Sequence, residues 1–125
     1  MIEAISTPGI PAGIGPNSQG IKDDRYLFLS GQTPVNPETK ELNGDSIESQ
    51  AEQVMQNIKA ILEHQGLDFT DVIKTTCFLV DMKDYPTFNT IYAKYFVGKP
   101  ARSCFAVKEL PRGSLCEIEL IASLK

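Results

Sequence analysis

The apolar positions between Ile47 and Leu62 constrain the fold of this chain more than any other feature of the sequence. They recur in steps of three and four residues, which places them along one side of a helix: Ile47, Ala51, Val54, Met55, Ile58, Ile61 and Leu62. Ser46 precedes them as a candidate N-cap, with Ser49 in place of the Glu of a full capping box, and Gly66 follows as a stop signal. We therefore predict an amphipathic helix between Ser46 and Gly66 that packs its apolar side against another layer of structure.

The segments on both sides of this helix are typical of strands, together with one further helix. Val, Ile, Thr and aromatic residues predict strands at residues 2–6, 19–22, 26–30, 71–80, 102–108 and 115–123. A second helix is predicted at about 84–97, where Pro86 falls in the first turn and is tolerated. Residues 7–18 and 33–44 are rich in Pro, Gly and Asn and are predicted to be loops. Asp23 and Asp24 predict a turn between two of the strands.

No repeat, linker or low-complexity segment divides the chain, so residues 1–125 are predicted to form one α+β domain. The two helices are expected to pack on the same face of a mixed sheet. In the last strand, Cys116, Ile118 and Leu120 alternate with an opposite face that includes Ile121, so both faces carry apolar residues. A homo-oligomer that covers the second face would explain this pattern, and an exposed hydrophobic face is the alternative.

The charge of the chain excludes some partners. Its formal net charge is −4 and its pI is near 4.9, which disfavours nucleic acid, because a phosphate backbone requires a basic surface. No apolar run approaches the roughly 20 residues that span a bilayer, and the first residues lack a charged-then-apolar leader pattern. We therefore expect a cytoplasmic protein that binds neither nucleic acid nor membrane.

The cysteines and the single histidine limit the possible chemistry. Cys77, Cys104 and Cys116 cannot all pair within one chain, and their spacing matches no zinc motif. Cys77 and Cys116 lie in apolar strands and are expected in the core. His64, the only histidine, falls in the last turn of the first helix, where the helix dipole favours a cation. Because hydrolytic triads and zinc sites usually recruit histidine, neither a metal site nor a triad is expected.

Arg102 begins a strand otherwise composed of small and apolar residues. Because side chains alternate along a strand, Arg102, Cys104 and Ala106 share one face. A guanidinium above an apolar floor can bind a carboxylate through two parallel hydrogen bonds. The alternatives are an arginine that reaches to solvent at the strand edge, or one that pairs with a structural acid. Cys104 is not expected to be a nucleophile, because no histidine is available to activate it.

Glu117 and Glu119 share one face of the last strand, where like charges repel unless they are solvated or paired. Glu117 is therefore a candidate acid–base group, and the alternative is a solvated outer face. Ser30 and Gly31 end an earlier strand, and the glycine permits the backbone to approach a ligand closely.

Four stretches then carry a resemblance in the right order over nearly the whole chain. They are Gly15-Pro16-Asn17-Ser18-Gln19, Leu29-Ser30-Gly31-Gln32, Phe88-Asn89 with Tyr92, and Pro100-Ala101-Arg102-Ser103 through Glu117-Ile118-Glu119. Together they resemble the RidA/YjgF family of enamine/imine deaminases. The resemblance implies a chorismate-mutase-like α+β fold and a homotrimer with a central barrel-like assembly and three clefts between subunits.

The resemblance also implies an activity, namely hydrolysis of 2-enamino and 2-imino acids, such as 2-aminoacrylate, to 2-oxo acids and ammonia without metal or cofactor. Carried over by position, Arg102 would bind the substrate carboxylate. Cys104 and Glu117 would hold and orient the attacking water, and Glu117 would transfer protons. Ser30 and Gly31 would line the cleft, and the further candidates for contact with the substrate are Asn17 and Asn89.

One departure from the family pattern keeps other functions open. Asn17 stands where relatives usually carry an aromatic residue that helps to wall the pocket. A non-catalytic module that binds 2-oxo acids as a metabolic sensor is therefore one alternative. An endoribonuclease or translation inhibitor, an activity attributed to some relatives, is another, and the acidic net charge argues against it.

Overall fold

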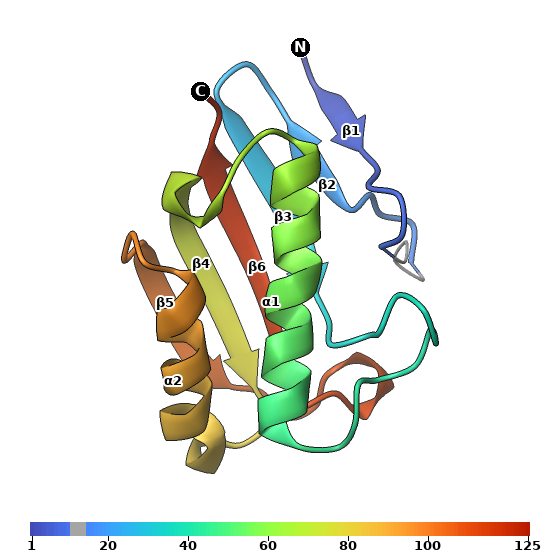
Figure 1. The fold of residues 1–125 in the computed structure, drawn as a ribbon, viewed down its shortest axis with the longest axis vertical. Helices are drawn as coiled ribbons and strands as arrows, with labels where there is room; N and C mark the ends of the chain where they lie inside the picture. The colour runs from blue at the N-terminus through green and yellow to red at the C-terminus, as the bar shows by residue number, and fades with distance from the viewer. Residues whose placement is uncertain (11–14) are drawn as a thin grey trace.

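The computed structural model describes residues 1–10 and 15–125, which form a layer of strands and a layer of helices (Figure 1). The strands are β1 (Glu3–Ile5), β2 (Gly20–Lys22), β3 (Tyr26–Gln32), β4 (Val72–Leu79), β5 (Ala101–Ala106) and β6 (Cys116–Ser123). They form one sheet in the order β1-β2-β3-β6-β4-β5. All neighbouring pairs are antiparallel except β4 and β5, which run parallel, so the sheet is mixed as predicted.

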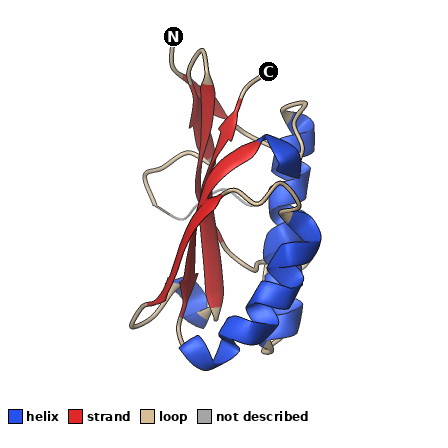
Figure 2. Ribbon diagram, turned by 90° about the vertical axis from the view of Figure 1, so that its left-hand side faces the viewer, coloured by secondary structure: helices blue, strands red, loops and turns tan. Residues whose placement is uncertain are grey.

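Two helices, α1 (Ile47–His64) and α2 (Tyr85–Tyr95), lie on the same face of the sheet (Figure 2). Three short 3-10 helices join the strands and helices: η1 (Phe69–Asp71), η2 (Met82–Asp84) and η3 (Pro111–Gly113). The hydroxyl of Ser46 accepts a hydrogen bond from the backbone N–H of Ser49 at 3.1 Å, which is the predicted cap of α1. The predicted class, an α+β domain with both helices on one face, is confirmed.

The predicted strands and helices are all present, with ends displaced by at most two residues. Strand β3 was expected to end at Ser30 and continues to Gln32, because a bulge between Leu29 and Gln32 lets the strand pair onward with β6. Residues 11–14, part of the predicted loop at 7–18, lie outside the described residues. In the described part of the chain, no helix has the length and apolar character needed to cross a membrane.

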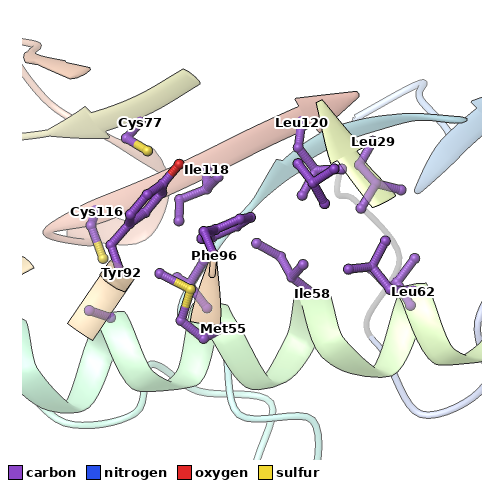
Figure 3. Packing of buried hydrophobic residues seen from close by; sticks show 14 of the residues in the cluster. Leu29, Met55, Ile58, Leu62, Cys77, Tyr92, Phe96, Cys116, Ile118 and Leu120 are labelled. Atoms are coloured by element: carbon purple, nitrogen blue, oxygen red, sulfur yellow. The ribbon is translucent and has the colours of Figure 1, made fainter. Parts of the chain in front are cut away.

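The core lies between the helix layer and the sheet. Met55, Ile58 and Leu62 point from α1 toward the sheet, where Ile118 and Leu120 of β6 face them (Figure 3). All five side chains are buried. Because burial of one such side chain is worth roughly 1.5–3 kcal/mol, this contact supplies much of the force that holds α1 on the sheet. The helix-spaced apolar positions of the sequence are therefore the ones that form the core.

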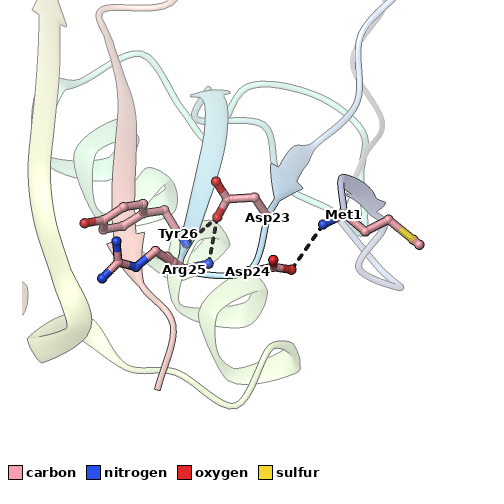
Figure 4. A network of polar contacts seen from close by, with 5 residues as sticks. All are labelled: Met1, Asp23, Asp24, Arg25 and Tyr26. Carbon is pink, nitrogen blue, oxygen red and sulfur yellow. Dashed lines mark hydrogen bonds and ion pairs between the residues drawn. The ribbon is translucent and has the colours of Figure 1, made fainter.

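Asp23 forms the turn between β2 and β3. One of its carboxylate oxygens accepts hydrogen bonds from the backbone N–H groups of Arg25, at 2.8 Å, and Tyr26, at 2.7 Å (Figure 4). These bonds lower the pKa of the Asp23 carboxyl. The neighbouring Asp24 pairs with the amino group of Met1 at 3.1 Å. The turn predicted from this acidic pair is confirmed.

Neither α1 nor α2 covers the opposite face of the sheet (Figure 2). Phe28 of β3 and Phe105 of β5 are 43% and 45% exposed there. Phe105 packs edge-on against Phe78 of β4, with 5.5 Å between the ring centroids. The apolar residues predicted on both faces of the late strands are therefore present, and one chain leaves the second face in contact with water.

Candidate active site

Arg102 lies on the helix-covered face of β5 and reaches toward α2. Its Nη1 donates a hydrogen bond to Oδ1 of Asn89 at 2.8 Å, and its Nη2 donates to the hydroxyl of Tyr85 at 2.9 Å. The centre of the guanidinium, Cζ, lies 4.7 Å from the ring centroid of Tyr92 and 5.5 Å from that of Tyr85. The charge therefore rests on aromatic faces, where cation–π attraction favours it, and two neutral groups fix its orientation.

No ion pair among the described residues involves Arg102. Among the described residues, Arg102 therefore does not pair with a structural acid, which was one of the alternatives. Its two hydrogen bonds use two of the five N–H donors of a guanidinium, which leaves the other donors for a bound anion. A half-buried arginine held by neutral partners is suited to bind a planar carboxylate.

Cys104 shares this face, two residues after Arg102, as the strand alternation predicted. It is half-buried and lies directly opposite Cys77 of β4. Hydrogen bonding with the Cys77 thiol lowers the pKa of the Cys104 thiol to about 7, burial opposes this shift, and the charge of Arg102 assists it. A thiol with this pKa is partly ionised near neutral pH.

A second group of predicted residues lines a cavity of about 280 Å³ at the end of β3. Asn17, Ser30, Gly31 and Glu117 all contribute to its wall. The hydroxyl of Ser30 donates a hydrogen bond to the backbone oxygen of Ser18 at 2.7 Å, which ties the strand to the preceding loop. The structure therefore brings together four of the residues proposed from the sequence.

Gly31 lets the Glu117 carboxylate lie against the backbone of β3. A Cβ atom added to Gly31 would fall 2.1 Å from Oε2 and 2.8 Å from Cδ of Glu117. Burial raises the pKa of the Glu117 carboxyl, and the negative charge of Glu119 on the same strand face raises it further. Glu117 therefore holds a proton more readily than an exposed glutamate, which suits a group that must both accept and donate protons.

One chain does not bring these two groups together. Cys116 and Ile118 are buried against the helices, so Glu117 between them points to the opposite face of the sheet. Arg102 points toward α2, and β4 separates its strand from β6. Arg102 and Cys104 therefore lie on one face of the sheet, and Glu117, the other residue expected to orient the water, lies on the opposite face.

Sequence reasoning missed three residues of these two groups. Tyr85 and Tyr92, with the predicted Asn89 between them, are spaced four and three residues apart, so they share one side of α2. This spacing next to an arginine-bearing strand was a usable signal, and Tyr92 entered the sequence analysis as part of the family resemblance, without a role at the site. Arg112 also lines the cavity, and its Nη1 donates to the backbone oxygen of Lys40 at 2.9 Å. No local pattern marks Arg112.

Within residues 1–10 and 15–125, no three His, Cys, Asp or Glu side chains gather closely enough to hold a metal ion.

Comparison with known proteins shows the family to which this chain belongs. The family model described as Endoribonuclease L-PSP matches residues 8–124. The chain belongs to the Rid/YjgF/L-PSP family. The predicted family is confirmed. The names of its members indicate more than one function.

Three relatives show the range of this family. AldR of Lactococcus lactis, described as a proposed regulator, is 50% identical over 99% of both chains. The 2-iminobutanoate/2-iminopropanoate deaminase of Mus musculus is 45% identical over 96% of this chain and 90% of its own. The crystal structure of the YjgF gene product of E. coli superposes with a TM-score of 0.91 at 40% identity, covering 98% of this chain and 99% of the other. Rid/YjgF/L-PSP membership thus includes a deaminase and a proposed regulator at similar identity.

Proposed function

We propose that this chain hydrolyses reactive 2-imino acids, and the 2-enamino acids that form them, to 2-oxo acids and ammonia. The observation that carries the proposal is the state of Arg102, which is oriented by Asn89 and Tyr85, rests on the ring of Tyr92 and forms no ion pair among the described residues. A substrate with a carboxylate would supply the missing counter-charge. The named deaminase at 45% identity supports the same reaction.

The complete site is proposed to form between two copies of the chain. One group lies on the helix-covered face of the sheet and contains Arg102 and Cys104, with Asn89 of α2 beside them. The second group lines the cavity and contains Glu117, Ser30, Gly31 and Asn17. The exposed rings of Phe28 and Phe105 provide apolar surface that a neighbouring copy could bury. A homotrimer, as the family resemblance implies, would place the arginine of one copy beside the glutamate of the next.

The reaction needs no strong nucleophile, because a protonated imine is already electrophilic. Arg102 would bind the carboxylate, and Glu117 would accept a proton from the attacking water as its oxygen bonds to the imine carbon. Glu117 would then return that proton to the nitrogen of the tetrahedral intermediate. As the carbon–nitrogen bond breaks and ammonia leaves, the hydroxyl group passes its proton to Glu117, and the 2-oxo acid remains. Cys104 would hold the water beside Arg102.

A second candidate is a regulatory module that binds 2-oxo acids without catalysis. Two observations favour it: the similarity to AldR, and Asn17 in the cavity wall, where the family resemblance implies an aromatic ring. The same anion-binding arginine would serve this function. Ribonuclease activity is not favoured, because the formal net charge of −4 opposes binding of a phosphate backbone.

The test is an assay in which a 2-imino acid is generated in situ and the release of ammonia and 2-oxo acid is followed. The deaminase proposal expects release well above the spontaneous rate, with the rate proportional to protein concentration. Binding of the 2-oxo acid without acceleration would favour the regulatory module. If the protein neither accelerates the release nor binds the 2-oxo acid, both candidate functions are contradicted.

A further inference from the structure

Cys77 and Cys104 are direct neighbours across the parallel ladder of β4 and β5. Both side chains lie on the helix-covered face, since Cys77 is fully buried in the core and Cys104 shares the face of Arg102. Figure 3 shows the sulfur of Cys77 near Tyr92, the residue whose ring supports Arg102. The two thiols thus lie beside the proposed carboxylate site, with one in the core and one at its edge.

The spacing of the strands suits a covalent bond between these cysteines. Neighbouring strands lie about 4.7–4.9 Å apart, and the Cα atoms of a disulfide are usually about 4.4–6.8 Å apart. The bridge can therefore form without separation of β4 and β5. Exchange with a dithiol would open such a bridge again.

The two thiols also differ in the way that stepwise oxidation requires. Cys104 is half-buried and has a pKa lowered to about 7, so it is partly thiolate and can meet an oxidant from outside. Hydrogen bonding with Cys104 and burial raise the pKa of the Cys77 thiol, so Cys77 stays protonated inside the core. Cys104 is thus the cysteine that reacts first, and Cys77 is placed to react with its product.

We propose that Cys77 and Cys104 form a redox-active pair that a peroxide converts reversibly into an intrachain disulfide. The Cys104 thiolate attacks one oxygen of the peroxide, the O–O bond breaks, and a sulfenic acid and hydroxide form. The Cys77 sulfur then attacks the sulfenic sulfur, the S–O bond breaks, and hydroxide leaves with the Cys77 proton as water. Overall, two thiols and one hydrogen peroxide give one disulfide and two waters.

The consequence for activity rests on the proposed deaminase function. In the disulfide, the Cys104 sulfur is bonded to Cys77 and can no longer hold a water beside Arg102. The oxidised protein is therefore inactive until a dithiol reductant reopens the bond. Formation of the disulfide itself does not depend on what the site does, so the two ideas can be tested separately.

Cys116 provides an internal control. It is fully buried, it lies opposite Leu79 rather than another cysteine, and burial raises the pKa of its thiol to about 12. It should remain reduced under conditions that oxidise the proposed pair.

Peptide mapping distinguishes the three cysteines. Cleavage after Lys and Arg places Cys77 in peptide 75–83, Cys104 in 103–108 and Cys116 in 113–125. After mild hydrogen peroxide treatment, alkylation under denaturing conditions and digestion without reductant, we expect a linked 75–83/103–108 species and an alkylated 113–125 peptide. Dithiothreitol before alkylation should remove the linked species. A sulfinic acid on 103–108 without linkage, or a link that includes 113–125, would overturn the proposal.

Two variants complete the test. Cys77→Ala should form no linked species. Without the resolving thiol, its Cys104 sulfenic acid should be oxidised further to sulfinic acid at higher peroxide, and that part of the lost activity should not return with dithiothreitol. Wild type and Cys116→Ala should lose activity by about tenfold or more and regain it with dithiothreitol. Sulfinic acid on peptide 103–108 that is no more abundant in Cys77→Ala than in wild type would contradict the pair. If the link forms in a protein that never hydrolyses imines, the redox pair stands and the deaminase proposal fails. If the protein hydrolyses imines and no link forms, the deaminase proposal stands and the redox pair fails.

Discussion

The carboxylate of Glu117 occupies the space that any side chain on Gly31 would need, since an added Cβ would lie 2.1 Å from Oε2. No positive φ is associated with Gly31, so its role is to make room rather than to relieve backbone strain. This contact holds the proposed proton carrier at one wall of the cavity and yields a sharp test of it.

Gly31→Ala should lower kcat/KM for imine hydrolysis by roughly ten- to a hundredfold, because a displacement of about 1 Å in a catalytic group can cost this much. Stability should fall by less than about 1 kcal/mol, because the clashing atoms are the far end of a side chain that can rotate away. Gly98→Ala is the matched control, since its added Cβ would lie 3.5 Å from the backbone of Thr70, an ordinary contact. Equal activity in both variants would argue against the role of Glu117.

Arg102→Ala should reduce kcat/KM by about a hundred- to several-thousandfold, which corresponds to roughly 3–5 kcal/mol of lost transition-state binding. Arg102→Lys should recover only part of this, because a point charge cannot form two parallel hydrogen bonds. Arg25→Ala removes an exposed arginine at the β2–β3 turn and should leave the rate unchanged. Steady-state kinetics on variants with unchanged Tm measures this. A well-folded Arg102→Ala protein with a normal rate would mean that the carboxylate is held elsewhere.

Glu117 should make both stability and activity depend on pH. The pKa of the Glu117 carboxyl is raised in the folded protein, so its protonation stabilises the fold. This stabilisation is fully present below the pKa that Glu117 has in the unfolded chain. It is lost as pH rises through the pKa that Glu117 has in the folded protein. Glu117→Gln should therefore gain thermal stability relative to wild type at neutral pH, and the difference should vanish in acid. Thermal melts across pH check the sign. A difference that grows toward low pH would contradict the raised pKa.

The same group should set the acidic limb of the pH–rate profile. Hydrolysis requires the Glu117 carboxylate as base, so kcat/KM should rise with pH through a midpoint above the ordinary range of a glutamate. In Glu117→Gln this limb should be absent and the rate lower by about a hundred- to ten-thousandfold. A limb that persists in this variant would assign the titration to another group.

The chain should sediment as a trimer at micromolar concentration if the open face of the sheet is an interface. Phe105→Glu places a charge on that face, where Phe105 contacts Phe78, and should yield a folded monomer with little activity. Met82→Glu alters a large apolar residue that is 43% exposed outside the sheet and should leave the trimer intact. A fully active monomer would contradict a site shared between copies.

Local patterns in the sequence determined the elements and the direction of each side chain within them. The step of three and four residues from Ile47 to Leu62 predicted α1, because helical geometry repeats within the segment itself. Strand alternation likewise predicted that Arg102 shares a face with Cys104, and Glu117 with Glu119. The site residues themselves were recognised by family resemblance, since each alone had an ordinary structural explanation.

Only the tertiary structure decided which of these faces meet. The order of strands inserts β4 between β5 and β6, which pairs Cys77 with Cys104 and separates Arg102 from Glu117. The bulge that sets Gly31 against Glu117, and the packing of Tyr85 and Tyr92 under the guanidinium, likewise join residues distant in sequence. Periodicity within one segment carries no information on its neighbours, because strand pairing and helix docking depend on the burial and hydrogen bonding of the whole chain.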